Sequence, residues 1–208
     1  MRIRSCFCIA FLVCAAALLL SWTSTCKAAS RDIPAQTRPT TRPSYDWFTA
    51  DAHQQLYEWS CIPMSVEMVL KLLDRVPQNY YALQQGWQDR RDGTFGDFDG
   101  RTIAGVTFHR KFFLPRNDKF PMDELFRTID SELDEGRIVI VSLLWSAAYH
   151  MFVIVDRTPS GDYRAISKLG SVTAEVIDVK ARIRRIKGTD IVTYTAAPAT
   201  PTTRPASR

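Results

Sequence analysis

A single cysteine stands out in the segment QQLYEWSCIPMSVEMVLKLL, residues 54–73. Pro63 fits only in the first turn of a helix, where its missing N–H costs nothing, so the apolar pattern after it predicts a helix that begins at Cys61. The positive end of a helix dipole lowers the pKa of a thiol, and the thiolate is the nucleophilic form. The residue types therefore predict that Cys61 is a catalytic nucleophile.

Acyl transfer by a thiolate also needs a general base and donors for the oxyanion. His150 is the candidate base, because it opens a β-branched run and its imidazole could face the start of the helix from the end of a strand. Gln55 lies six residues before Cys61 and is the candidate oxyanion donor, together with the backbone N–H of Cys61. Cys61, His150 and Gln55 form the predicted catalytic set.

Helices and strands that would position these residues follow from the hydrophobic periodicity. Helices are predicted over residues 61–74, 79–91 and 121–136, and strands over 137–145, 150–156, 163–169, 172–179 and 191–196. Helices come first and strands joined by short turns follow, so we expect an α+β fold with a helical layer packed on an antiparallel sheet.

The N-terminus has the pattern of a signal peptide over residues 1–28, with two arginines, an apolar stretch and small residues before a cleavage site. Two alternatives stay open: an uncleaved anchor through residues 5–22, and lipid attachment at Cys26. We therefore expect an exported protein that is periplasmic, secreted or membrane-anchored, with any membrane attachment through the N-terminus only. Cleavage removes four of the five cysteines, so one mature chain has no internal disulfide.

Two segments rich in Pro and Thr, residues 29–44 and 196–208, flank a predicted folded unit at 45–195. Their composition predicts a linker and a disordered tail. The 208-residue chain carries a net charge of +5, but eight basic residues and one acid lie in the terminal segments, so the folded unit is near −2. The basic run KARIRRIK (180–187) alternates with isoleucines and predicts a solvated face. No nucleic-acid partner is expected.

Together, Gln-x5-Cys on a helix and a later His on a strand resemble the papain-like cysteine peptidases. CIPMSVEMVLKLL and LDEGRIVIVSLLWSAAYHMFVIVD are similar to cysteine peptidase family 39, which includes the bacteriocin leader peptidases. The resemblance covers roughly residues 50–170. It implies a central helix on an antiparallel sheet, with Cys61 as nucleophile, His150 as general base and acid, and Gln55 as oxyanion donor. It also implies a peptide or protein substrate and no cofactor.

The chain departs from this family at two positions. Ile62 replaces the usual glycine after the cysteine, and no Asp or Asn lies where the family orients its histidine. A hairpin at TPSGD places Ser167, Lys168 and Leu169 nearest His150. Asp156 has the right strand parity but lies roughly 20 Å along the strand. The orienting group is therefore Ser167, Asp156 or none.

Competing interpretations follow from the same residues. One alternative to an enzyme is a binding module, a degenerate papain fold that lacks the Asp/Asn and binds ligands without turnover. Another is an envelope tether, whose function would depend on its two tails. A zinc site from Cys61, His150 and His109 lacks a fourth ligand and a closely spaced pair. His53 is predicted at the pocket rim. Core packing is the expected role for most of an aromatic group that flanks the cysteine, Trp47, Phe48, Tyr57 and Trp59.

Overall fold

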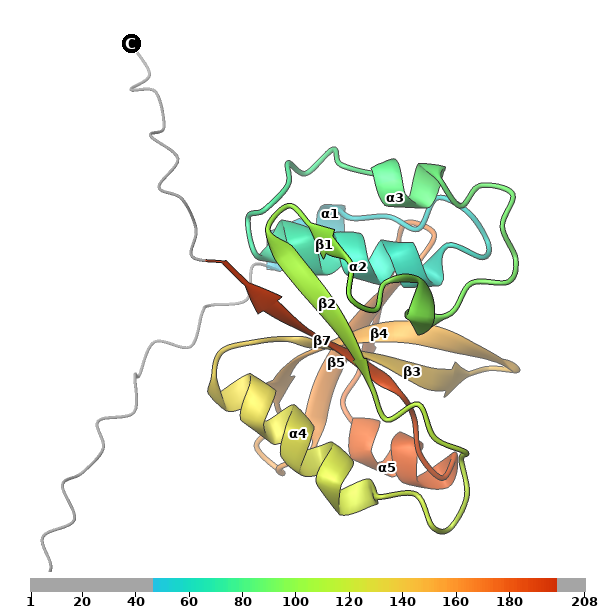
Figure 1. Cartoon of the computed structure of the whole chain (residues 1–208), viewed down its shortest axis with the longest axis vertical. Helices are drawn as coiled ribbons and strands as arrows, with labels where there is room; N and C mark the ends of the chain where they lie inside the picture. Colours follow the sequence, from blue (N-terminus) through green and yellow to red (C-terminus); the bar gives the residue numbers. More distant parts are fainter. Residues whose placement is uncertain (1–46, 198–208) are drawn as a thin grey trace, which may run out of the picture. The chain divides into compact units, whose positions relative to one another are not determined.

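The computed structural model of the protein describes residues 47–197 (Figure 1). The predicted signal segment 1–28, the linker 29–44 and residues 198–208 of the tail predicted over 196–208 lie outside the described residues. Within residues 47–197, none of the helices combines the length and the apolar character that a membrane crossing requires.

The described chain has an α+β fold, as predicted, built on a seven-stranded sheet whose neighbouring strands are all antiparallel. The strand order is β1-β2-β7-β3-β4-β5-β6. The strands are β1 (Thr102–Ile103), β2 (Val106–Lys111), β3 (Val139–Trp145), β4 (Ala148–Arg157), β5 (Tyr163–Leu169), β6 (Val172–Val176) and β7 (Ile191–Ala196). The helices are α1 (Trp47–Ala52), α2 (Cys61–Leu72), α3 (Ala82–Gln85), the 3-10 turn η1 (Phe95–Asp97), α4 (Met122–Asp134) and α5 (Val179–Arg185).

Helix α2 packs on one face of the sheet, and α1 and α3 lie on the same side (Figure 1). Its apolar side chains share a core with one face of strands β2, β3, β4, β5 and β7, through Val106, Ile140, Val153, Ile166 and Val192. Every residue from Ile62 to Lys71 is buried, so α2 is covered all round by the sheet and by α1, α3 and their loops. A helix in this position holds its first residue, Cys61, against the sheet.

Helices α4 and α5 cover the opposite face (Figure 1). They pack on the alternate residues of the same strands, among them Val139, Phe152, Ala165 and Ile191. Because both faces of the sheet are buried, its central strands have continuous apolar runs in place of a strict alternation of apolar and polar residues.

The predicted elements agree with most of the observed ones. The helix predicted over 79–91 is an exception, because only Ala82–Gln85 is α-helical and the chain then turns through Gly86. Strand β1, helix α1 and the extent of strand β2 were not predicted. Most of the basic run 180–187 lies in α5, with Val179 and Ile183 buried, Arg182 half-buried, and Arg184 and Arg185 exposed.

Candidate active site

Cys61 is the first residue of α2 and its thiol is half-buried. Three backbone N–H groups, those of Cys61, Ile62 and Met151, lie close enough to the sulfur to favour the thiolate. Burial disfavours the charged form more strongly, so the pKa of the thiol is raised above its ordinary value. In the substrate-free protein Cys61 is therefore a neutral thiol at neutral pH.

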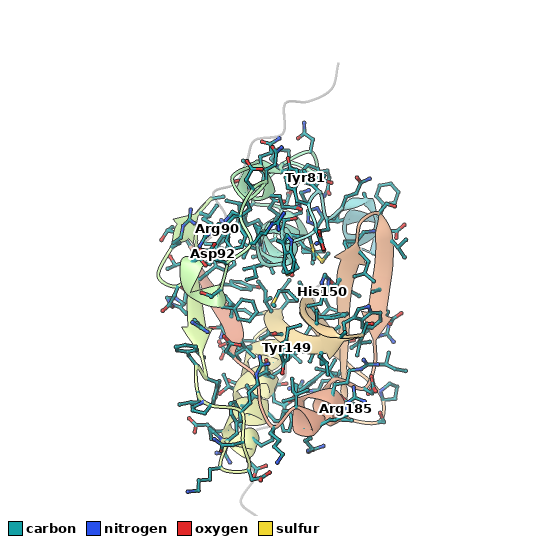
Figure 2. All side chains as sticks on the ribbon, turned by 90° about the vertical axis from the view of Figure 1, so that its right-hand side faces the viewer. Tyr81, Arg90, Asp92, Tyr149, His150 and Arg185 are labelled. Atoms are coloured by element: carbon teal, nitrogen blue, oxygen red, sulfur yellow. The ribbon has the colours of Figure 1, made fainter. Side chains whose placement is uncertain are left out.

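His150 lies near the start of β4 and is also half-buried. Figure 2 shows it between Tyr81, on the side of α2 and α3, and Arg185 of α5. Its Nε2 atom lies 2.8 Å from Ser167 Oγ and 3.2 Å from the carbonyl oxygen of Lys168, both on β5. Burial lowers the pKa of the imidazole, more than the Lys168 carbonyl raises it. His150 is therefore neutral at neutral pH.

The tautomer of His150 follows from these partners. Ser167 Oγ donates its one proton to Met151 O at 2.6 Å, so it can only accept from the imidazole. The Lys168 carbonyl is an acceptor as well. Nε2 must then carry the hydrogen, and Nδ1 presents a lone pair to take up a proton.

The hydrogen-bond partners of His150 thus lie on β5, and Ser167 is one of the predicted orienting groups. Ser167 is fully buried, and the backbone carbonyl of Lys168 is a second acceptor that side-chain patterns cannot reveal. Asp156, the other predicted orienter, lies beyond a β-bulge at the far end of β4, where its Oδ1 accepts from the N–H of Arg157 at 2.6 Å.

Cys61 and His150 are brought to the same region through Met151. Met151 follows His150 on β4, and its N–H is one of the three groups near the sulfur of Cys61. Side chains alternate along a strand, however, so Met151 points toward α2 and His150 lies on the opposite face of the sheet, with Phe152. The rings of His150 and Phe152 meet edge-on, with their centroids 5.5 Å apart. The imidazole can approach the thiol only around the end of β4, and within residues 47–197 no hydrogen bond joins them.

Gln55 lies in the loop before Cys61. Its Nε2 donates to the carbonyls of Tyr57 and Glu58 at 2.8 and 2.9 Å, so both amide hydrogens are engaged within the loop. Its Oε1 atom is buried and has no hydrogen-bond partner among residues 47–197. The role of Gln55 as oxyanion donor stays a prediction, and it requires one of these two bonds to be released.

His53 was predicted at the pocket rim, and this prediction is wrong because its side chain is fully buried. Its Nε2 donates to Met64 O at 3.0 Å, and its Nδ1 accepts from Lys71 Nζ at 2.8 Å. The ring stacks on Tyr81, over which the Lys71 ammonium also lies at 3.7 Å. Burial and the charge of Lys71 lower the pKa of His53 to about 3.

The structure also shows where the aromatic residues that flank Cys61, and His109, lie. Trp47, Phe48 and Trp59 are exposed, so the prediction of core packing is wrong for them. His109 lies on β2, where its Nε2 is 3.2 Å from Thr195 Oγ1. In the described part of the chain, no group of three or more His, Cys, Asp or Glu side chains is arranged to hold a metal ion.

Comparison of the chain with protein-family models, with curated proteins and with solved structures finds no match. Any assignment of function therefore depends on the site itself.

Proposed function

We propose that the protein is an exported papain-like cysteine peptidase or amidase that hydrolyses a peptide bond through Cys61 and His150. The observation that carries the proposal is the pair of acceptors on Nε2 of His150. These two acceptors support the proposal because they hold the imidazole ring and leave Nδ1 as its basic nitrogen. For this orienting role the sequence had left Ser167, Asp156 or no group open. The position of Cys61 at the start of α2, with three N–H groups around its sulfur, is the second support.

The reaction follows from these groups. Nδ1 of His150 takes the proton of the Cys61 thiol as the sulfur attacks the carbonyl carbon of the substrate. The backbone N–H of Cys61 and Gln55 stabilise the oxyanion. The imidazolium then protonates the amine as the C–N bond breaks, leaving a thioester on Cys61. Water attacks the thioester with Nδ1 as base, which releases the acid and restores the thiol.

The imidazole must approach the thiol around the end of β4 for this step. To the extent that Ser167 Oγ and the Lys168 carbonyl keep their bonds to Nε2, they also stabilise the imidazolium when it forms. Neither is a carboxylate, so this stabilisation is weaker than that given by an ionised Asp. We therefore expect a slow enzyme compared with one that has a full triad. Its substrate is a peptide or protein met outside the cytoplasm, and the chemistry needs no cofactor.

Turnover of a quenched-fluorescence peptide library by the purified protein tests the proposal. Replacing the nucleophile, Cys61→Ala, is expected to abolish cleavage, and replacing the base, His150→Ala, to lower it by about 10³-fold or more, since general base catalysis is lost. His109→Ala is the matched control and should cleave like the wild type, because His109 is a half-buried histidine on β2 whose ring partner is Thr195. Cleavage that survives Cys61→Ala would exclude the proposed mechanism.

A binding module is the second candidate, favoured by two observations. Both Cys61 and His150 are neutral at rest, and the imidazole lies on the sheet face opposite Met151. Alkylation of Cys61 by iodoacetamide across pH separates the candidates. Burial predicts a midpoint above the ~8.5 of a free thiol in the substrate-free protein.

The enzyme and the module then differ in the presence of a cleavable peptide. For the enzyme, peptide should protect Cys61 from alkylation and be consumed. For the module, peptide is bound and recovered intact. A midpoint well below ~8.5 would show that the thiol and the imidazole form an ion pair, which would exclude the module.

A further inference from the structure

A buried glutamine in α3 holds the loop that leads into Cys61. The side chain of Gln84 is fully buried and both ends of its amide are saturated. Nε2 donates to Glu67 Oε2 at 2.7 Å and to the carbonyl of Gln54 at 3.0 Å. Oε1 accepts from the N–H of Leu56 at 2.8 Å and lies 2.8 Å from the hydroxyl of Ser60. The Ser60 hydroxyl has one proton, and the carbonyl of Tyr57, at 2.9 Å, is its other acceptor. One amide therefore bonds the start and middle of the loop 54–60 and shares the hydroxyl at its end with Tyr57.

Glu67 fixes the orientation of this amide. Its carboxylate also accepts from the backbone N–H of Leu83 and Gln84, at 2.8 and 3.1 Å. Glu67 is buried in the middle of α2. The carbonyl of Gln54 can only accept, so it also requires Nε2 at this end of the amide. The N–H of Leu56 can only donate, so Oε1 faces Leu56 and Ser60. The bonds run from the middle of α2, through Gln84, back to the residue before the nucleophile.

The loop that Gln84 holds contains two parts of the candidate site. Gln55 is bonded within it and its N–H donates to the carbonyl of Gly170, in the turn between β5 and β6, at 2.9 Å. Ser60 is the N-cap of α2, and its side chain makes no capping bond to the helix. Gln84 thus contacts the N-cap residue from outside the helix, through the Ser60 hydroxyl.

We propose that Gln84, oriented by Glu67, is a positioning residue that sets the place of Cys61 and of the Gln55 loop in the active site. This inference deepens the proposed function and rests on it, since it concerns the placing of the same nucleophile. Gln84 reaches Cys61 only through Ser60, so it is a positioning residue in the strict sense.

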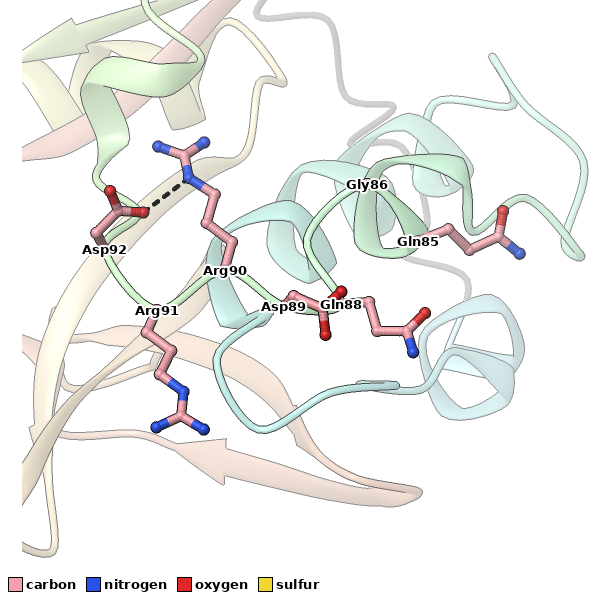
Figure 3. A pocket seen from close by; sticks show the side chains of 7 residues that line it. All are labelled: Gln85, Gly86, Gln88, Asp89, Arg90, Arg91 and Asp92. Atoms are coloured by element: carbon pink, nitrogen blue, oxygen red, sulfur yellow. Dashed lines mark hydrogen bonds and ion pairs between the residues drawn. The ribbon is translucent and has the colours of Figure 1, made fainter.

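The next residue supplies a matched control. Gln85 is in the same short helix, is exposed, and lines an open polar hollow with Gly86, Gln88, Asp89, Arg90, Arg91 and Asp92. Figure 3 shows its side chain pointing away from Arg90 and Asp92, whose ion pair is marked by the dashed line. Gln85→Met makes the same chemical change as Gln84→Met without touching the loop.

Alkylation of Cys61 across pH tests the proposal without a substrate. Burial is the largest cause that raises the pKa of Cys61, so a released loop should admit water and lower the alkylation midpoint. We expect Gln84→Met to lower it by about half a pH unit or more, an approximately threefold change in thiolate at a fixed pH below the midpoint. Gln85→Met should leave the midpoint unchanged.

Two further variants separate positioning from folding. Ser60→Ala removes one hydroxyl, which lies by Gln84 Oε1 and also bonds the N–H and the carbonyl of Tyr57 within the loop. We expect it to lower the midpoint less than Gln84→Met, because the bonds of Gln84 to Gln54 and Leu56 remain. The exchange of Glu67→Gln with Gln84→Glu restores the bond between positions 67 and 84 with its polarity reversed, although the bond to Gln54 is lost. Its midpoint should lie closer to wild type than that of either single variant.

The proposal is overturned if Gln84→Met and Ser60→Ala are folded by circular dichroism and keep the wild-type midpoint. Lowered melting temperatures with an unchanged midpoint would likewise show a purely structural role. If the wild type cleaves no peptide but the midpoint shifts as expected, the hydrolase is excluded and the positioning of Cys61 by Gln84 stands.

Discussion

Buried ionisable side chains decide much of the behaviour of this protein at the residue scale. Glu67, Lys71 and His53 lie together around α2, and each has a pKa moved toward its neutral form by burial: raised for Glu67, lowered to about 8 for Lys71 and to about 3 for His53. Each also has hydrogen-bond partners, so the network orders the loop before Cys61 at a cost in desolvation.

The depressed pKa of His53 predicts a loss of stability in acid. The unfolded histidine, at about 6.5, binds a proton more readily than the folded one at about 3. Its contribution is therefore complete above pH 6.5 and declines as the pH falls toward 3, by about 1.4 kcal/mol per unit. We expect a loss of about 2 kcal/mol in the free energy of unfolding at pH 5. Chemical denaturation at pH 7 and pH 5 measures it.

His53→Gln is the control for this titration. A glutamine amide can donate to Met64 O and accept from Lys71 Nζ as the imidazole does, but it does not titrate. The groups that face position 53, among them Lys71, Lys168 and Tyr81, are unchanged in the variant. The difference in acid sensitivity between the two proteins therefore belongs to His53, and equal sensitivity would contradict the prediction.

At the scale of elements, the junction between α5 and β7 depends on one glycine. Gly188 has a φ of +119°, and a Cβ there would lie 2.3 Å from the ring of Phe120. Phe120 is buried in the core beneath α4 and α5, so the ring cannot move away freely. We expect Gly188→Ala to lower the free energy of unfolding by about 3 kcal/mol, from strain and overpacking together. Urea denaturation measures the loss.

Gly161 provides the comparison. It has a φ of +80° in the turn between β4 and β5, and nothing lies within 4 Å of an added Cβ. Gly161→Ala should therefore show the backbone strain alone, about 1 kcal/mol. Equal losses in the two variants would show that the ring of Phe120 yields to the methyl group.

How far the sequence predicted each element depends on where its stabilising contacts lie. Helices α2 and α4 and strand β5 were predicted within two residues, because their apolar periodicity is local. Helix α3 was predicted too long, because nothing in the polar segment 79–91 indicates where its helical hydrogen bonds end. Its short helix is held by Glu67, which contacts it from a distant part of the chain.

The candidate site shows the same division. Cys61 at a helix start and His150 on a strand followed from local pattern. Only one of the two partners of His150 could be predicted from the sequence. Strand pairing places Ser167 near His150, but the Lys168 carbonyl is a backbone group that every residue has, so the residue types do not reveal it. The buried positions of His53 and Gln84 could not be predicted, since each depends on contacts between segments distant in sequence. Polar residues at i and i+4 inside an apolar helix, Glu67 and Lys71, were the one available signal.

At the scale of the whole molecule, the last strand in the sequence lies inside the sheet. Strand β7 pairs with β2 on one side and with β3 on the other. The strands that precede it in the chain therefore cannot complete the sheet until the C-terminal residues are in place. After the strand, the N–H of Ala197 donates to the carbonyl of Gly105 at 3.1 Å, so the ordered chain extends beyond the predicted boundary at 195.

This topology predicts that two C-terminal truncations of similar length behave very differently. A chain that ends at residue 197 keeps β7 and its last hydrogen bond, and we expect its free energy of unfolding to equal that of the full chain. A chain that ends at residue 190 lacks β7, which leaves β2 and β3 with unpaired edges and exposes the apolar residues that β7 covers in both cores. We expect it to show no cooperative unfolding transition by circular dichroism. Cooperative folding of the chain that ends at residue 190 would contradict the central place of β7. If the chain that ends at residue 197 folds and cleaves peptides but loses its function in the cell, the alternative of an envelope tether, whose function depends on its tails, would be favoured.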